Sequence, residues 1–255
     1  GEAETKEGRL RAFRAGPEGT MMDLGTLGGE ISRAFDVNDA GVIVGEAMRE
    51  DGQMAGFVWR GGGGGGGAAG RGGGGGRRGG AINGEGVILG VGGGGGGGSV
   101  GGGMRGEGQR GGFVWREGEG MKELEAPEGT LGSRAVAING KGVILGMVED
   151  VEGMGPVVWE EGRMRRLSRL PVAGAVQAFD LNDGGDVVGQ VETGPQEFFM
   201  SHGFFHGEAL TTPHLQSFRL ITQEGSGAAL AVNLRGVAVG FAGNGDGVSR
   251  AFRYD

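Results

Sequence analysis

The sequence has 255 residues and no cysteine, so neither disulfide bonds nor cysteine-ligated metal sites can stabilise the fold. Basic residues are also in the minority, because 24 lysines and arginines stand against 32 aspartates and glutamates. A nucleic-acid partner favours a basic surface, so we expect none. The most apolar stretch, residues 228–242, is interrupted by Asn233 and Arg235. A spanning helix needs roughly 20 apolar residues, so we expect no membrane span.

Signatures of catalysis and metal binding are missing as well. His202 and His206 would lie roughly 13 Å apart on a strand, too far to share one ion. The Asn244-Gly245-Asp246-Gly247 turn offers a single carboxylate, whereas calcium takes about six to eight oxygens. We therefore predict no catalytic residue, no metal site and no cofactor, which disfavours an enzyme. Two carboxylates that converge only in the fold would still allow a glycoside hydrolase.

Glycine is in large excess, with 67 residues and uninterrupted runs at 61–67, 72–76, 92–98 and 101–103. The runs do not disturb the spacing of the surrounding sequence. Arg60 lies as far from Ile82, across glycine runs, as Arg116 lies from Ile138, across ordinary sequence. We interpret many of these glycines as placeholders for residues whose side chains have not been identified.

One nine-residue pattern occurs five times, with asparagine second and glycine fifth and ninth. The copies are VNDAGVIVG at 37–45, INGEGVILG at 82–90, INGKGVILG at 138–146, LNDGGDVVG at 181–189 and VNLRGVAVG at 232–240. Such a periodic unit indicates a repeat fold.

Each copy of the pattern predicts a β-hairpin. The asparagine (Asn38, Asn83, Asn139, Asn182 and Asn233) suits a tight turn, because its side chain can bond nearby backbone amides. The fifth residue (Gly41, Gly86, Gly142, Gly185 and Gly236) falls where a type I turn followed by a bulge requires positive φ. A β-branched run then forms the return strand. The ninth residue (Gly45, Gly90, Gly146, Gly189 and Gly240) is expected to permit close packing or a bend.

A strand rich in aromatic residues follows each hairpin. Alternation places Phe57 and Trp59 on one face and Val58 on the other. We expect this face to pack between repeats, which involves Phe57, Trp59, Phe113, Trp115, Trp159 and Phe204. Repetition at one strand position favours this packing role over a sugar-stacking role for the tryptophans. A fourth short strand follows in several repeats, as at 121–126.

Four short strands in each repeat of roughly 40–50 residues are typical of β-propeller blades. The fold prediction is therefore an all-β, five-bladed β-propeller over residues 1–255, one domain, with a β-solenoid as the alternative. The aromatic strand occurs once more than the hairpin, because Arg11-Ala12-Phe13-Arg14 repeats Arg250-Ala251-Phe252-Arg253. We expect residues 20–24 to complete the last blade, which would leave residues 9–14 outside the ring.

The DLGTLGG segment at 23–29, the AIN…GVILG hairpin and the Phe-x-Trp strand together resemble the HAF repeat, named for His-Ala-Phe. The histidine is mostly replaced, for instance by Arg11 and Arg250, and His202-Gly203-Phe204 is the nearest match. The resemblance implies a secreted or cell-surface β-propeller-like domain. It implies little about activity, because a fold does not determine function.

Two functions remain open on this reading. The first is a non-enzymatic extracellular or cell-surface scaffold whose partner is a protein, a glycan or copies of itself. The alternative is an extracellular polysaccharide-active enzyme with its site at the central mouth of the propeller. The ligand-binding residues are not identified by the sequence.

Overall fold

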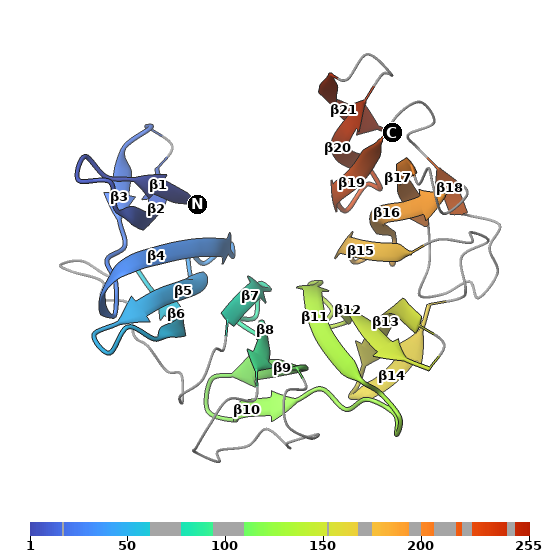
Figure 1. Ribbon diagram of the computed structural model, residues 1–255, viewed down its shortest axis with the longest axis horizontal. Helices are drawn as coiled ribbons and strands as arrows, with labels where there is room; N and C mark the ends of the chain where they lie inside the picture. Colours follow the sequence, from blue (N-terminus) through green and yellow to red (C-terminus); the bar gives the residue numbers. More distant parts are fainter. Residues whose placement is uncertain are drawn as a thin grey trace. The chain divides into compact units, whose positions relative to one another are not determined.

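The structure is a computed structural model, and it describes residues 1–16, 18–61, 78–93, 110–151, 153–167, 175–193, 200–206, 218–220, 226–243 and 248–255. Every regular element in these residues is a β-strand, and every sheet is antiparallel (Figure 1). The all-β prediction is therefore confirmed. The chain divides into two compact units, Gly1–Leu124 and Glu125–Asp255.

Unit 1 contains three sheets, each assembled from strands that are consecutive in the chain. The first sheet has strands β1 (Glu2–Glu4), β2 (Leu10–Ala15) and β3 (Met21–Asp23). The second has β4 (Gly28–Val37), β5 (Ile43–Arg49) and β6 (Met54–Trp59). The third has β7 (Arg78–Ile82), β8 (Ile88–Gly93), β9 (Arg110–Arg116) and β10 (Gly120–Glu123).

Unit 2 repeats the same meander three times. Its first sheet has β11 (Gly132–Ile138), β12 (Ile144–Asp150), β13 (Gly153–Glu160) and β14 (Arg163–Arg166). Its second has β15 (Val176–Leu181), β16 (Val187–Thr193), β17 (Met200–His206) and β18 (Phe218–Leu220). Its third has β19 (Gly227–Val232), β20 (Ala238–Gly243) and β21 (Ser249–Tyr254).

The five sequence motifs form the hairpins β4–β5, β7–β8, β11–β12, β15–β16 and β19–β20. In each turn the asparagine Oδ1 accepts the amide of the residue four positions later, as in Val143 N to Asn139 Oδ1 at 2.9 Å. The fifth-position glycines all have positive φ, from 73° at Gly41 to 88° at Gly185. Only glycine adopts this conformation without steric cost, which explains why the turn requires it.

The ninth glycine lies where three strands of a sheet come closest. A Cβ atom at Gly189 would lie 2.8 Å from the Phe204 ring on β17 and closer still to the Gln177 carbonyl on β15. Gly45 and Gly240 have the same surroundings, with Phe57 and Phe252 as the covering rings. In all five hairpins the pairing of the two strands skips one residue just after the residue opposite this glycine. Such a skipped residue is a β-bulge.

Apolar side chains on facing sheets form the core between neighbouring sheets of each unit. In unit 2, Leu145 and Met147 of β12 pack with Ala178, Val187 and Phe204 of the next sheet. In the following junction, Val188 of β16 packs with Ala229, Val232 and Ala238. In unit 1, Val44 of β5 packs with Ile82 and Ile88. One face of each return strand therefore points to the next sheet, and the other points to the preceding sheet.

The first and last sheets contain different strands of the repeat. In β1–β3 the second, third and fourth strands of the repeat are present, because Gly1 and Phe13 occupy the places of Gly45 and Phe57. In β19–β21 the first, second and third strands are present. The expectation that residues 20–24 complete the last sheet is wrong, because residues 21–23 form β3 and pair with β2. A short connection lets β3 pair locally at a low entropic cost.

A glycine-to-alanine pair tests the close approach at the ninth position. Gly45→Ala forces a methyl group against the Phe57 ring, 2.7 Å away, and the Arg33 carbonyl, and should destabilise the protein by about 2 kcal/mol. Gly84→Ala is the control, because its Cβ would meet nothing within 4 Å. Urea denaturation measures both variants. Equal midpoints for the two would contradict a packing role for the ninth glycine.

Candidate functional site

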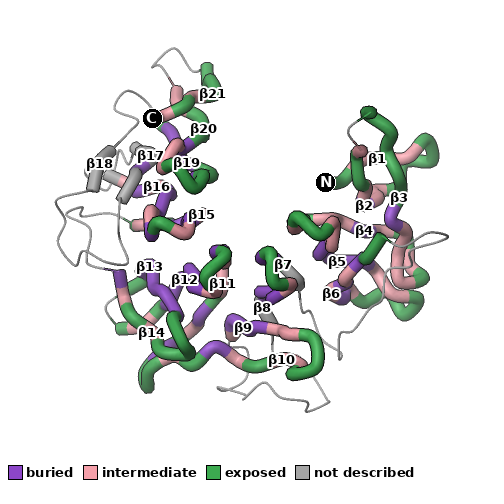
Figure 2. The backbone as a smooth tube through the Cα atoms, turned by 180° about the vertical axis from the view of Figure 1, so that it is seen from behind, coloured by how far each residue is buried: buried purple, intermediate pink, exposed green. Residues whose placement is uncertain are grey.

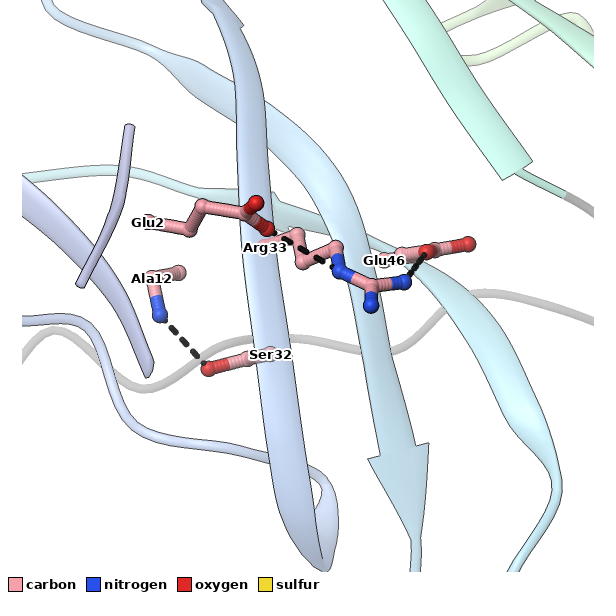
Figure 3. Close-up of polar contacts among 5 residues, drawn as sticks. All are labelled: Glu2, Ala12, Ser32, Arg33 and Glu46. Carbon is pink, nitrogen blue, oxygen red and sulfur yellow. Dashed lines mark hydrogen bonds and ion pairs between the residues drawn. The ribbon is translucent and has the colours of Figure 1, made fainter. Parts of the chain in front are cut away.

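The most deeply buried charge in the described residues is the Glu46 carboxylate on β5, whose side chain is 1% exposed. The guanidinium of Arg33 on β4 lies beside it, with Nη1 2.9 Å from Glu46 Oε1. The same guanidinium reaches Glu2 on the first sheet, with Nε 3.0 Å from Oε2 (Figure 3). One arginine on β4 therefore bridges a buried carboxylate and an exposed one on the neighbouring sheet.

Ser32 makes a second connection between the first two sheets, one residue before Arg33. Its hydroxyl donates to the Gly25 carbonyl at 2.7 Å. It also accepts the Ala12 amide at 3.0 Å (Figure 3). Ser32 and Ala12 are both fully buried. This hydroxyl satisfies two backbone groups that would otherwise be costly to bury.

The chemistry of the Arg33 cluster is that of a structural ion pair. Hydrogen bonding to Glu46 is the largest influence on Arg33 and raises the pKa of its guanidinium above the usual value. Because the pKa of Arg33 is higher in the folded state than in the unfolded state, the charged guanidinium stabilises the fold. This stabilisation is lost only when the pH rises through the folded-state pKa, far above neutrality. Arg33 therefore stays charged under ordinary conditions and holds the two carboxylates in place.

The turn asparagines join neighbouring sheets. Besides closing its own turn, Asn139 donates its side-chain amide to the Asn182 carbonyl at 3.1 Å. Asn182 donates in the same way to the Asn233 carbonyl at 2.7 Å, and Asn38 donates to the Asn83 carbonyl at 3.0 Å. We call this arrangement the asparagine ladder. It connects the turns of successive sheets within each unit.

Two aspartates strengthen the same junctions. Asp36 lies two residues before Asn38, and its carboxylate accepts the Ile82 amide at 2.9 Å. Asp180 lies two residues before Asn182 and accepts the Val232 amide at 2.9 Å. The other three repeats have Ala81, Ala137 and Ala231 at this place. Sequence reasoning missed these links, and the only signal for them was an Asp-x-Asn triplet in two repeats.

The residues expected to pack between repeats lie in or beside the inter-sheet cores. Phe57, Trp59, Phe113, Trp159 and Phe204 are buried, and Trp115 is partly buried. Trp159 also donates its indole N–H to the Glu125 carbonyl at 2.6 Å. Burial of these rings is consistent with the predicted packing role.

The other candidate features do not come together as a site in the described residues. His202 and His206 lie on β17, in register with Val191 and Val187. His214 and the Asn244–Gly247 turn lie outside the described residues. Among the residues that are described, no three histidines, aspartates or glutamates are grouped closely enough to hold a metal ion. The same part of the chain contains no helix of the length and apolarity needed to cross a membrane.

The asparagine ladder can be tested with two equivalent positions. Asn38 closes its turn and bonds the next sheet, whereas Asn233 accepts bonds from Arg235 and Val237 within its own turn. Asn38→Ala should cost about 1 kcal/mol more than Asn233→Ala, because it also removes an inter-sheet hydrogen bond. Thermal or urea unfolding measures the difference. Identical losses would show that the ladder adds nothing beyond turn closure.

The Arg33 bridge predicts unequal effects at its two ends. Arg33→Met removes the guanidinium from the buried Glu46 carboxylate and should destabilise the protein by about 3 kcal/mol. Glu2→Gln removes only the partly exposed pair, with side chains 39% and 48% exposed, and should change stability by less than about 1 kcal/mol. Urea unfolding at neutral pH checks both variants. The prediction fails if Glu2→Gln costs as much as Arg33→Met.

Comparison with known proteins supports the architecture and leaves the activity open. No protein-family model and no curated protein matches the sequence. The chain is similar to TolB from Acinetobacter baumannii, with a TM-score of 0.55 and 11% identity over 96% of this chain and 56% of the TolB chain. A weaker likeness, with a TM-score of 0.43 and 11% identity, joins 100% of this chain to 78% of an arginine-to-alanine mutant of AofleA from Arthrobotrys oligospora. The TolB likeness shows a β-propeller-like fold.

Proposed function

We propose that the chain is a non-catalytic binding scaffold, extracellular or at the cell surface, that engages protein partners through the face of a β-sheet. The location rests on the resemblance to the HAF repeat. The binding role rests on one observation about the last sheet, β19–β21. Side chains that are covered in the first sheet of unit 2 are uncovered there.

The uncovered side chains occupy the sixth and eighth positions after the turn asparagine. In the first sheet of unit 2 these are Leu145 and Met147, which are 0% and 2% exposed. In the last sheet they are Val239 and Phe241, which are 45% and 38% exposed. Figure 2 shows the contrast between β12, which is mostly buried, and β20 and β21, in which exposed and partly exposed residues predominate.

The composition of this face suits a protein partner. Val239 and Phe241 stand on β20, and Ala251 and Arg253 stand opposite them on β21. Aromatic residues and arginine are enriched in protein–protein interfaces. A contiguous apolar face rimmed by charge typically marks such an interaction site. We call Val239, Phe241, Ala251 and Arg253 the β20–β21 face.

Substitution of the central ring tests the proposal. Phe241→Asp places a charge in the middle of the β20–β21 face and should weaken binding at least about tenfold, equivalent to roughly 1.4 kcal/mol. The probe is the labelled chain binding to immobilised copies of the same chain. Val151→Asp is the matched control, because Val151 is 93% exposed on the β12–β13 turn of the same unit.

The outcomes separate a sheet-face scaffold from other roles. Loss of binding in Phe241→Asp with retention in Val151→Asp supports the proposal. Unchanged binding in Phe241→Asp contradicts it, as does an absence of binding by the parent chain at high protein concentration. Release of sugars from a polysaccharide panel by the purified chain would contradict the non-catalytic role.

A further inference from the structure

The sequence Arg-Ala-Phe-Arg occurs twice, at 11–14 on β2 and at 250–253 on β21. The two strands hold equivalent places in their sheets. A Cβ atom on Gly1 would lie 2.9 Å from the Phe13 ring, and one on Gly240 would lie 2.9 Å from the Phe252 ring. Ala12 and Arg14 of the first sheet therefore correspond to Ala251 and Arg253 of the last.

The first copy of this sequence is docked on the β4–β6 sheet. Ala12 is fully buried and packs in one cluster with Ile43, Ala47, Phe57 and Trp59. Its amide donates to Ser32 Oγ at 3.0 Å. The guanidinium carbon of Arg14 lies 5.7 Å from the centroid of the Trp59 ring, within cation–π range. We call Ser32, Ile43, Ala47, Phe57 and Trp59 the β4–β6 acceptor face.

The second copy carries the same side chains on an exposed face. Ala251 and Arg253 are exposed, beside the exposed Val239 and Phe241. Arg253 forms an ion pair with Asp255, with Nη2 2.6 Å from Oδ1, and the two side chains are 67% and 65% exposed. Exposed ion pairs contribute little to stability, so this contact would not prevent Arg253 from binding elsewhere.

We infer that the β20–β21 face of one copy docks on the β4–β6 acceptor face of a second copy and displaces that copy's β1–β3 sheet. This inference rests on the proposed scaffold function and names its partner. Ala251 takes the place of Ala12, so that its amide donates to Ser32 Oγ. Arg253 takes the place of Arg14 over Trp59. Phe241 takes the place of Glu2 beside Arg33, which keeps its buried partner Glu46.

The chain's own β1–β3 sheet and the β20–β21 face of another copy compete for the same acceptor face. The β1–β3 sheet is joined directly to β4, which gives it a high effective concentration at the acceptor face. The exchange therefore requires a high protein concentration or a weakened β1–β3 contact. Because the two surfaces are different patches, the contact is heterologous and links copies head to tail.

Cysteine cross-linking tests this contact directly, because the sequence has no cysteine. One full-length chain carries Ala251→Cys, and a second carries Ser32→Cys together with Ala12→Glu, which places a charge at a fully buried position and loosens β1–β3. The two chains are mixed and oxidised mildly. The expected product is a disulfide-linked heterodimer, mapped by mass spectrometry to positions 32 and 251.

Two controls fix the interpretation. Arg250→Cys replaces Ala251→Cys as the matched negative control, because neighbouring residues on a strand point to opposite faces. A single chain with Ala12→Cys and Ser32→Cys is the positive control and should close an intramolecular bond. If Ala12→Glu aggregates, the same mixture without that substitution should give a heterodimer whose yield rises with concentration.

The inference is overturned if the positive control closes but no heterodimer joins positions 32 and 251 in either mixture. It is also overturned if Arg250→Cys links as efficiently as Ala251→Cys. If either result is found while Phe241→Asp still weakens self-binding, the scaffold proposal stands. The β20–β21 face then binds a surface other than the β4–β6 acceptor face. Loss of both effects would remove the proposed function as well.

Discussion

The turn asparagine is the residue on which the rest of the architecture depends. Its side-chain oxygen closes its own hairpin, and its side-chain amide donates to the backbone of the next turn. An asparagine amide has both an acceptor and a donor end, so one side chain can satisfy both requirements. The geometry of a turn and the distance to the next sheet are therefore set together. Asn38, Asn139 and Asn182 each make both contacts, and alanine at these positions could make neither.

The glycine that ends each hairpin motif supplies the second constraint. Because it has no side chain, the aromatic ring of the third strand can lie across the second strand and reach the first. The ring then faces the preceding sheet, and the intervening side chains of the return strand face the next one. Each repeat therefore has two unlike faces that fit each other. Stacking of identical units follows from this polarity, as it does in other repeat proteins.

The hairpins and the close packing at the ninth glycine were predictable, because their signals lie within nine residues. The sheet-to-sheet bonds were not, because the groups they join are far apart in sequence. Asp36 accepts from Ile82, and Ser32 accepts from Ala12, so neither pairing leaves a local pattern. The first sheet was misassigned for a related reason. Met21–Asp23 (β3) contains no motif that identifies its partner strand. It pairs with β2, the strand to which a short turn joins it.

The last sheet of unit 2 exposes the face that β12 buries against the following sheet, and the residues on that face decide whether it is capped or competent to bind. The β20–β21 face carries Val239 and Phe241 where a cap would carry charged residues. Its strand also duplicates four residues of β2, whose docked form shows which surface they fit. The docking sequence occurs twice in the chain, at 11–14 and 250–253, but one β4–β6 acceptor face can bind only one copy at a time. The occupied state is therefore decided by tethering and concentration, and the same chemistry that joins neighbouring sheets would join neighbouring molecules.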